Sequence, residues 1–532
     1  MLLIISGQYV ESELSAEFGR IPPAFLPLGN QRLCTHQVGQ LSRHYPETAL
    51  TLPSDFTLDG PDASMLAALN VRVCRTTAGS PLGAAVREAL GHVVLDGRID
   101  ILYGDTLVYE DELGGTDWIA VGGSDDNYPW HYEGADEGAD GTGEAAADAT
   151  HGEAWAGMFS FSSALDLLRM LEQCDDFIEA VTRYGEACHP LERRSLKRWL
   201  DFGHVHTYFH SRLAVTTQRH FNHLRIEDGV VTKSSDDRRK MQAEAAWFAS
   251  APAAIRPYLP NLISPELPGP PGDGAVAGYA IEYLPLVPLN ELFVFGRLPG
   301  KVWRRIFRAC DRFLCAARSV PVPPTSARAA DATMADRLYR SKTMERLAVF
   351  ARQTGVDLDA PWRLGGHALP SLRRMADEAA GLAMAQPPAP SFVHGDFCFS
   401  NTLFDFRSDR VKLIDPRGLD ADGRITPFGD FRYDIAKLAH SVLGLYDVIV
   451  AGRYTLQGSG HDLAFEVFPE SRADIADAFR GTAFAGRLPQ AWDAQPIMVL
   501  LFLSMLPLHV DNPPRQRALM ANALRLYQEM CP

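Results

Sequence analysis

Paired cysteines are missing from this chain. Its eight cysteines are scattered over 532 residues, and no two of them form a C-x-x-C pair. The spacing therefore argues against a zinc site or a redox-active pair and indicates free thiols in a reducing cytosol. The cysteines stand at Cys34, Cys74, Cys174, Cys188, Cys310, Cys315, Cys398 and Cys531.

Long hydrophobic runs are lacking as well. Residues 1–7 hold a short apolar run with no basic segment before it, unlike a secretory signal peptide. The most apolar later run, residues 497–506, is shorter than the roughly 20 residues that cross a bilayer. We therefore expect a cytoplasmic protein with no membrane span, in which residues 497–506 form a buried helix.

Positive charge is in deficit. The chain carries 51 Lys and Arg against 66 Asp and Glu, which gives a formal net charge of −15 at pH 7. A general nucleic-acid binder neutralises phosphates with an excess of cations, so we expect no nucleic-acid partner. Small nucleotides can still bind through a few local cations and Mg²⁺. At 532 residues the chain exceeds one ordinary core, and two or three domains are expected.

Strands and helices alternate in the first part of the chain. Such alternation predicts an α/β domain with a doubly wound, mostly parallel sheet, in which ligands lie at the carboxyl ends of strands. Asp105 falls at such an end. Residues 133–153 form an acidic run rich in Gly and Ala, which indicates a flexible surface insertion. The predicted strands are 2–6, 48–52, 71–75 and 99–106, and the predicted helices are 32–45, 81–94 and 164–173.

Three segments of this part carry a family resemblance. They are F-L-P-L-G-N at 25–30, Gly104-Asp105 at a strand end, and W-L-D-F-G at 199–203. On these segments, residues 1–212 resemble a sugar-phosphate or phosphocholine nucleotidyltransferase. The resemblance implies that Asp105 and Asp201 hold the Mg²⁺ that bridges the phosphates of nucleotide and sugar, with CTP or another NTP as the nucleotide.

Two features of that family are not found in the sequence. Residues 7–9 and 22–24 stand where the family has its G-x-G-T-R loop and the lysine before its L-P segment. The missing groups would cradle and neutralise a triphosphate. Arg20, Arg32 and Lys197 are the candidates to replace them.

A different pattern begins near residue 216. Residues 221–232 predict a hairpin through the turn signal Asp228-Gly229. Lys233 follows the second strand, and the predicted helix after it carries Glu244. A strand lysine followed by a helix glutamate is the arrangement with which kinases hold the α- and β-phosphates of ATP.

The most specific signal lies in residues 391–415. An H-G-D turn at 394–396 follows a short apolar strand, Asn401 comes five residues after Asp396, and a second strand leads into Asp415. Two carboxylates and an amide are thereby delivered around one small volume. A divalent metal that carries a nucleotide's phosphates requires such a set of oxygen donors.

The pattern H-G-D-x4-N followed by a strand ending in I-D is similar to the catalytic core of the aminoglycoside phosphotransferase and choline kinase superfamily. The resemblance implies that Asp396 is the catalytic base or orients the attacking hydroxyl. It implies that Asn401 and Asp415 bind Mg²⁺ or Mn²⁺ and that His394 braces the loop. Asp434, in the later G-D-x3-D-x-A segment, is implied to be a structural residue that positions a helix.

The same resemblance implies a two-lobed, protein-kinase-like α+β domain over residues 213–532. Its N-lobe covers about 213–290 and its C-lobe about 291–532, with only helices expected after residue 436. ATP is the implied phosphoryl donor, and Lys233 and Glu244 hold its phosphates. Glu282 and Tyr283 lie in a strand that resembles the hinge, which hydrogen-bonds adenine.

Three further patterns can be interpreted as structural as well as functional. The D-F-G at 201–203 precedes the kinase-like residues, and this order excludes the protein-kinase role of that motif. His204, His206 and His210 lack a Cys or Glu at ligand spacing, which favours polar surface or core histidines over a metal site. His509 and Asp511 could bind a phosphoryl acceptor, but a helix end with a solvated carboxylate fits them equally well.

Together these features predict a fusion of two enzymes. The kinase phosphorylates a hydroxyl of a sugar, polyol or amino alcohol, and the first domain joins the product to an NTP for surface polysaccharide or capsule biosynthesis. One alternative is an N-terminal domain that binds a nucleotide sugar without catalysis, which the missing G-x-G-T-R loop favours. Another is an aminoglycoside-type resistance kinase, against which the fusion argues. The acceptor and the oligomeric state stay open.

Overall fold

A computed structural model describes residues 1–92, 97–110, 113–123, 153–215, 218–219, 222–267, 277–324, 331–468 and 472–531. These residues form two compact units. The first holds Met1–Thr216 and Phe295–Arg297, and the second holds Thr217–Val294 and Leu298–Pro532. The acidic insertion predicted at 133–153 lies outside the described residues, apart from the strand residue at its end.

The first unit contains eleven of the named strands and seven of the named helices in the described part of the chain. The strands are β1 (Leu2–Ile5), β2 (Pro27–Leu28), β3 (Gln31–Arg32), β4 (Thr48–Pro53), β5 (Val71–Thr76), β6 (Ile99–Tyr103), β7 (Thr106–Tyr109), β8 (Trp118–Gly123), β9 (Glu153–Phe161), β10 (Glu192–Ser195) and β11 (Arg198–Asp201). The helices are α1 (Ser12–Phe18), α2 (Leu33–Leu41), α3 (Gly60–Ala68), α4 (Leu82–Leu90), α5 (Ala164–Leu171), α6 (Phe177–Ala187) and α7 (Val205–Val215).

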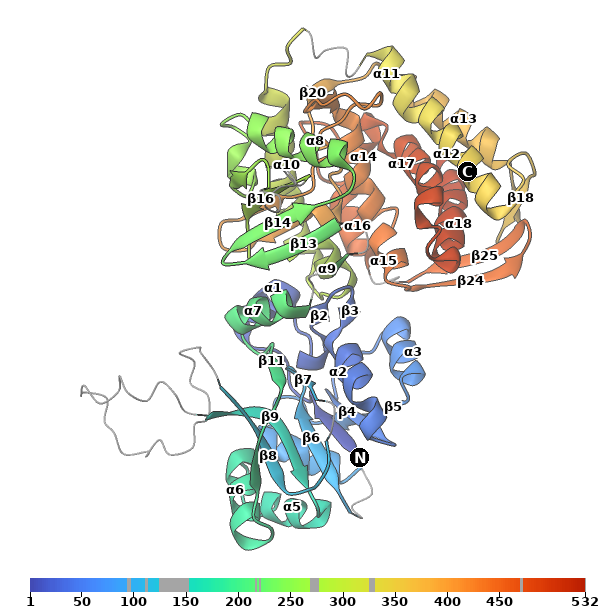
Figure 1. Ribbon diagram of the computed structural model, residues 1–532. Coiled ribbons are helices and arrows are strands. Elements are labelled where there is room, and N and C mark those ends of the chain that lie inside the picture. The colour runs from blue at the N-terminus through green and yellow to red at the C-terminus, as the bar shows by residue number, and fades with distance from the viewer. Residues whose placement is uncertain are drawn as a thin grey trace. The chain divides into compact units, whose positions relative to one another are not determined.

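Seven of these strands form one sheet in the order β10-β8-β9-β6-β1-β4-β5 (Figure 1). β1 pairs in parallel with β4 and with β6, β4 pairs in parallel with β5, and β10 with β8. Only β9 runs antiparallel to its neighbours β6 and β8. The mostly parallel α/β sheet expected from the sequence is therefore confirmed.

Apolar side chains explain why these strands lie in the middle of the unit. All four residues of β1 and all six of β4 are buried, as in strands covered on both faces. Helices α4, α5 and α6 pack on the sheet in one core with residues such as Leu3, Ile101, Phe159 and Phe161. The carboxyl ends of β1, β4 and β6 thus lie along one edge, which is where an open α/β sheet binds its ligands.

The second unit begins with a five-stranded antiparallel sheet in the order β12-β13-β14-β16-β15. The predicted hairpin is its β13–β14 pair, and both turn residues have positive φ, 47° at Asp228 and 74° at Gly229. That conformation suits an Asp-Gly turn between two strands. The bounds are β12 (Gln218–Arg219), β13 (Asn222–Glu227), β14 (Val230–Ser234), α8 (Arg238–Ser250), β15 (Leu262–Ser264) and β16 (Gly278–Glu282).

Helices make up most of the remainder of this unit, and short strands connect them. A five-residue π-helical turn, Arg337–Ser341, joins α11 to α12. The helices are α9 (Leu289–Val294), α10 (Gly300–Ser319), α11 (Ala332–Asp336), α12 (Lys342–Thr354), α13 (Leu372–Ala383), α14 (Phe431–Val442), α15 (Tyr446–Val450), α16 (Ala473–Arg480), α17 (Ala494–Met505) and α18 (Pro513–Met530). The strands are β17 (Val287–Pro288), β18 (Trp362–Leu364), β19 (His367–Leu369), β20 (Pro390–Phe392), β21 (Thr402–Asp405), β22 (Arg410–Leu413), β23 (Phe428–Asp430), β24 (Tyr454–Ser459) and β25 (Asp462–Val467).

The expectation that only helices follow residue 436 is wrong. Strands β24 and β25 form a hairpin that pairs with β18 through β25. Most of the hairpin's side chains are exposed or half-buried, so its sequence carries little of the apolar alternation that identifies a strand. The buried helix expected at 497–506 is present as part of α17, in which the nine residues from Ile497 to Met505 are buried; Leu506, just after the helix, is buried as well.

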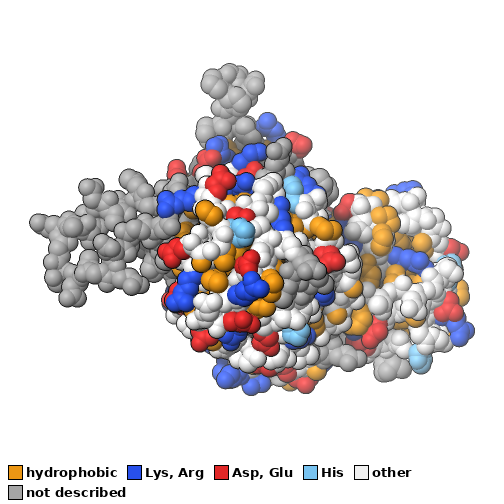
Figure 2. All heavy atoms as spheres, turned by 90° about the horizontal axis from the view of Figure 1, so that it is seen from below, with side chains coloured by type: hydrophobic (Ala, Val, Ile, Leu, Met, Phe, Trp, Pro, Cys, Tyr) orange, Lys and Arg blue, Asp and Glu red, His pale blue; other side chains and the backbone are white. Residues whose placement is uncertain are grey.

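Cysteine pairing, membrane-spanning helices and surface charge were each considered in the sequence and can be compared with the structure. All eight cysteines are free thiols. Among the described residues, no helix combines the length and the apolar character needed to cross a bilayer. On the face drawn in Figure 2, acidic and basic side chains are interspersed and do not gather in one patch of a single sign.

Candidate active sites

The H-G-D turn after β20 is held in place by a carboxylate from α14. Asp434 accepts a hydrogen bond from the backbone N–H of His394 at 2.7 Å and another from that of Gly395 at 2.8 Å. Gly395 has φ +77°, and a Cβ there would lie 2.7 Å from Cβ of Arg417. The turn therefore needs glycine at this position, and Asp434 positions the residue that follows it, Asp396.

His394 is a neutral bridge inside the loop. Burial lowers its pKa to about 4. Its Nε2 donates to the carbonyl oxygen of Ile414 at 3.0 Å, and its Nδ1 accepts the backbone N–H of Asp396 at 3.3 Å. Both ring nitrogens are thus used to join the turn to the end of β22, which places the imidazole as a brace.

The carboxylate of Asp396 lies between an amide and an ammonium group. The side-chain NH₂ of Asn401 donates to the backbone oxygen of Asp396 and to Oδ2 of Asp396, each at 3.0 Å. Nζ of Lys437, on α14, lies 2.7 Å from its Oδ1. Burial by itself would raise the pKa of this carboxyl group, but the charge of Lys437 lowers the pKa of Asp396 to about 2.

Lys437 is a site residue that the motifs do not point to. It follows Asp434 by three positions in α14, so both side chains lie on one face of the helix. This spacing could have identified Lys437 from the sequence. A helix that holds the H-G-D turn through Asp434 also brings the residue three positions later close to Asp396.

Lys233, Glu244 and Asp415 form a second group of charges. Nζ of Lys233 lies 2.6 Å from Oε2 of Glu244 and 3.0 Å from Oδ1 of Asp415. The hydroxyl of Tyr279 donates to Glu244 at 2.7 Å. Burial opposes the charge on Lys233, but the carboxylates of Asp415 and Glu244 outweigh it and raise its pKa. Lys233 therefore stays charged where it faces Asp415.

Asp415 and Asn401 fit the chemistry of a bound divalent cation. Both carry hard oxygen donors at the ends of the β21–β22 hairpin, and Asp415 has a left-handed φ of 56°. A non-glycine residue in that region is uncommon and points to a functional constraint. In the described part of the chain, no three His, Cys, Asp or Glu side chains group into a metal site. Mg²⁺ that is held by one or two carboxylates completes its shell with phosphate oxygens and water.

The hinge-like strand differs from the expectation at its backbone donors. The N–H of Glu282 donates to the carbonyl oxygen of Asn261 at 2.9 Å, and the N–H of Tyr283 donates to that of Gly229 at 2.7 Å. The side chain of Glu282 also accepts hydrogen bonds from Asn261. Neither N–H is available to adenine, because antiparallel pairing within the lobe already uses both.

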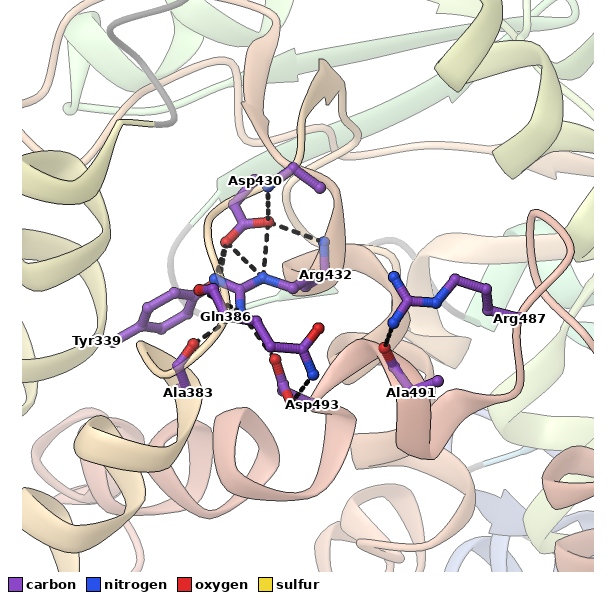
Figure 3. A network of polar contacts seen from close by, with 9 residues as sticks. Tyr339, Ala383, Gln386, Asp430, Arg432, Arg487, Ala491 and Asp493 are labelled. Atoms are coloured by element: carbon purple, nitrogen blue, oxygen red, sulfur yellow. Dashed lines mark hydrogen bonds and ion pairs between the residues drawn. The ribbon is translucent and has the colours of Figure 1, made fainter.

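A buried polar network anchors the start of α14. Figure 3 shows the guanidinium of Arg432 between Asp430 and Asp493, with ion-pair distances of 2.7 Å and 2.9 Å. Arg432 is 1% exposed, and it also donates to the carbonyl oxygen of Ala383 at 2.7 Å. The hydroxyl of Tyr339 donates to Asp430 at 2.9 Å. Because breaking a buried pair is costly, this network fixes the helix that carries Asp434 and Lys437.

The two residues suggested for the acceptor lie further along the chain and outside this group. Asp511 is exposed, and its Oδ2 pairs with Arg515 at 2.5 Å. The ring of His509 lies 6.0 Å from that of Tyr446, which in turn lies 4.6 Å from the ring of His440 on α14. In the described structure, neither Asp511 nor His509 is hydrogen-bonded to Asp396.

In the first unit, Asp105 and Asp201 are brought together by strand pairing. β7 pairs with β11, and the N–H of Phe202 donates to the backbone oxygen of Asp105 at 2.8 Å. A Cβ added to Gly203 would lie 2.8 Å from Oδ2 of Asp105 and 3.4 Å from Oδ1 of Asp201. The two carboxylates therefore face one small volume, and burial raises the pKa of Asp105. Two acidic oxygens in such a place suit a divalent cation.

One candidate to neutralise a triphosphate is already used inside the first unit. Arg32 is 3% exposed and pairs with Asp62 through Nη2 at 2.7 Å and Nε at 3.2 Å. Its expected role is wrong, because this buried guanidinium has a structural carboxylate partner. Arg20 is exposed, lies 3.8 Å over the ring of Tyr9, and pairs with Asp55 at 3.0 Å. The backbone N–H of Lys197 donates to Glu110 at 3.1 Å.

A family model matches part of the chain. Residues 209–446 match the model of the phosphotransferase enzyme family. The match bears out the resemblance that the motifs predicted and supports an enzyme of the small-molecule kinase type. No curated protein matches the chain.

Solved structures similar to the chain fall into two groups. A choline/ethanolamine kinase family protein from Mesorhizobium loti is 12% identical with a TM-score of 0.32, and 59% of this chain and 91% of that one are covered. An aminoglycoside-3'-phosphotransferase of type VIII is 17% identical with a TM-score of 0.30, at 53% and 88% coverage. A nucleoside-diphosphate-sugar pyrophosphorylase from Vibrio cholerae RC9 is 13% identical with a TM-score of 0.30, at 40% and 99% coverage.

Proposed function

We propose that the second unit transfers the γ-phosphoryl group of ATP to a hydroxyl of a small polar metabolite. The acceptor oxygen bonds to the γ-phosphorus while the bond from that phosphorus to the β,γ-bridging oxygen breaks and ADP leaves. Asp396 orients the hydroxyl and receives its proton. Mg²⁺ or Mn²⁺ supplies charge neutralisation for the phosphates, and Asn401 and Asp415 are the residues that would hold it.

The contact of Lys233 with both Glu244 and Asp415 carries this proposal. The distances of 2.6 Å and 3.0 Å join a phosphate-binding lysine to a candidate metal ligand. A nucleotide bound there presents its phosphates to the lysine and the metal together. Since phosphoryl transfer depends chiefly on positioning and charge neutralisation, this arrangement suits it.

For the first unit we propose nucleotidyl transfer on the kinase product. The oxygen of the new phosphate attacks the α-phosphorus of CTP or another NTP, and pyrophosphate leaves as the α,β-bridging bond breaks. Asp105 and Asp201 would hold the divalent cation. The product is an NDP-activated metabolite, and we assign it to cytoplasmic supply of surface polysaccharide or capsule biosynthesis.

One observation favours a second candidate for the first unit. The G-x-G-T-R loop is missing, and Arg32 is bound to Asp62, so a triphosphate would lack these cationic partners. In this second candidate the first unit binds a nucleotide sugar without catalysing transfer.

An assay of both products tests these proposals. ATP consumption is measured over sugars, polyols, sugar acids, sugar phosphates and amino alcohols, with products identified by mass spectrometry, and each NTP is then added with a pyrophosphate readout. Phosphorylated acceptor and subsequent pyrophosphate release support the fusion. Phosphorylation without pyrophosphate from any NTP, together with calorimetric binding of an NDP-sugar, supports the binding-only candidate. Lack of any phosphorylated product contradicts the kinase proposal.

A further inference from the structure

Four cationic side chains gather close to Asp396 in the second unit. Lys342 and Arg346 come from α12, Arg417 follows β22, and Lys437 comes from α14. Lys437 contacts Asp396 directly. The charges of Arg346, Arg417 and Lys437 all lower the pKa of Lys342. We call Lys342, Arg346, Arg417 and Lys437 the cationic cluster.

Two of these side chains line adjoining cavities. Lys342 lines a small cavity together with Tyr433 and Ser504. Arg417 lines a larger cavity that also includes Gly395 of the H-G-D turn. Tyr433 lines both, so the two cavities adjoin. Lys342 and Arg417 thus border the space beside the H-G-D turn.

Three of the four cations in this cluster have no carboxylate partner among the described residues. The side chain of Lys342 has no hydrogen bond or ion pair among the described residues, and the side chain of Arg417 has only a cation–π contact there, 5.7 Å from the centre of the Tyr433 ring. Nη1 of Arg346 donates to a backbone oxygen, that of Ser504, at 3.1 Å. Asp396, a carboxylate whose charge acts on Lys342, is already paired with Lys437.

The other acids at the cavity walls are used as well. Asp430 is paired with Arg432 at 2.7 Å. Asp420 accepts backbone N–H groups from Asp422 at 2.9 Å and from Arg424 at 2.8 Å. Backbone N–H groups leave the negative charge of Asp420 in place, but the four cations of the cluster outnumber Asp420 and Asp396. Positive charge therefore exceeds negative charge around these cavities, although the chain as a whole has a net charge of −15.

The charged form of Lys342 is disfavoured at this partly buried position among three other cations. Burial lowers the pKa of Lys342, and the charges of Arg417, Arg346 and Lys437 lower it further. Packing does not require the charge, since an apolar side chain of similar length would avoid the repulsion. Such an arrangement is explained if a bound ligand supplies the missing negative charge.

We propose that the cationic cluster binds an anionic group, a carboxylate or a phosphate, on the acceptor whose hydroxyl Asp396 orients. This inference rests on the proposed kinase function. The nucleotide's phosphates have a separate cation, Lys233, which faces Asp415 rather than Asp396. Cationic acceptors such as amino alcohols and aminoglycosides are disfavoured, because they would bring a positive charge to a site that already has an excess.

Matched acceptors test the charge requirement. The panel contains glucose, glucuronate, glucose 6-phosphate and glucosamine, together with glycerol, glycerate, glycerol 3-phosphate and choline. We expect at least a tenfold higher kcat/KM for the anionic members than for their neutral counterparts, and the lowest values for the cationic ones. The carboxylate and phosphate arms distinguish the two anionic sources. Preference for a neutral or cationic member overturns the inference while leaving the kinase function intact.

Substitution of Lys342 tests the location. Lys342→Met should raise the KM for the anionic acceptor at least tenfold, leave the KM for ATP within twofold, and not lower the melting temperature. Lys342→Arg should retain most of the affinity. Arg352→Met, an exposed residue of the same helix, is the control and should change neither KM. A rise in the KM for ATP alone, or an unchanged KM for the acceptor, overturns the inference.

Failure of the kinase function can be separated from failure of this inference. If no panel member is phosphorylated, binding of inorganic phosphate is measured by calorimetry on full-length protein saturated with Mg-ADP. Submillimolar binding that is lost in Lys342→Met supports the anion site and contradicts only the kinase function. Absence of such binding overturns the anion site as well.

Discussion

Nζ of Lys437 lies 2.7 Å from Oδ1 of Asp396, and Lys437 shares a face of α14 with Asp434, which holds the H-G-D turn. One helix therefore sets both the position and the charge of the candidate base. Asp396→Asn keeps the size of the side chain but removes its ability to accept a proton. We expect kcat for acceptor phosphorylation to fall by about 10²- to 10⁴-fold, the usual contribution of a general base. Steady-state kinetics measure this loss.

Nucleotide binding provides the control for Asp396→Asn. Because Lys233 and Asp415 are unchanged, calorimetric affinity for Mg-ADP should stay within about twofold of the wild-type value. A variant that keeps full kcat would remove Asp396 from the mechanism.

The pH profile should report on Lys437. This lysine lowers the pKa of Asp396 to about 2, so Asp396 is ionised throughout the usual assay range. Lys437→Met removes the opposing charge, and burial then raises that pKa. The base becomes protonated at a higher pH, and the acid limb of the kcat/KM profile should move upward. The profile is measured between pH 4 and 9 for both proteins. An unmoved acid limb would contradict this electrostatic role.

Glu244 is expected to matter for stability as well as for ATP. Glu244→Gln breaks a buried ion pair, and loss of one partner of such a pair costs about 3–5 kcal/mol of unfolding free energy. We expect the lower part of that range, because Lys233 keeps Asp415 at 3.0 Å. The KM for ATP should rise in parallel. Urea unfolding and ATP titration measure the two effects.

Tyr279→Phe is the matched control for Glu244→Gln. It removes only the hydroxyl that donates to Glu244 at 2.7 Å. The expected cost is about 1 kcal/mol, the net value of an ordinary hydrogen bond, with little change in the KM for ATP. Equal effects of the two variants would argue that packing, rather than the ion pair, holds this region.

The candidate sites were predictable wherever local patterns carried them. Asp396, Asn401 and Asp415 stand in one short segment and Asp105 follows a strand, so turn and strand signals found them. Asp201 was found through the resemblance carried by the W-L-D-F-G segment. These side chains could be expected to lie close together within each unit, because strand pairing in the sheet and in the hairpin brings the strand ends that carry them side by side. The prediction used only residues close to a motif.

Residues whose role depends on tertiary packing were not predictable in this way. Lys437 stands in a helix with no motif of its own, and the cationic cluster draws on Lys342 and Arg417, far apart in sequence. Arg32, in β3, looked like a phosphate ligand by position, but it pairs with Asp62 from helix α3. The N–H of Tyr283 was expected to bind adenine, but in the structure it donates to the carbonyl oxygen of Gly229.

The two functions should separate by mutation in the first unit. Asp105→Asn and Asp201→Asn each remove one of the two carboxylates that face a common volume, and pyrophosphate release from any NTP should be lost. Phosphorylation of the acceptor should persist unchanged. Glu186→Gln, at an exposed position of α6 in the same unit, is the control. Pyrophosphate release that survives both substitutions would contradict the assignment of these aspartates to the metal.

Asp447 should make stability fall as pH rises. It is 6% exposed, its Oδ2 has no hydrogen-bond partner among the described residues, and burial raises its pKa to about 7. The folded protein therefore holds a proton there that the unfolded chain, with an ordinary aspartate pKa near 4, has already lost. Stability from this proton is complete below about pH 4 and is lost as pH rises to about 7.

Asp447→Asn should remove this dependence, because an amide has no proton to lose. The wild type and the variant should be similar in urea unfolding at pH 4, and the variant should be more stable at pH 8 by roughly 2–4 kcal/mol. Asp434→Asn offers a contrast, since Asp434 accepts two backbone N–H groups and its amide should destabilise the protein at both pH values. Parallel curves of stability against pH for the wild type and Asp447→Asn would contradict this prediction. They would show that Asp447 is as fully ionised in the folded protein as in the unfolded chain.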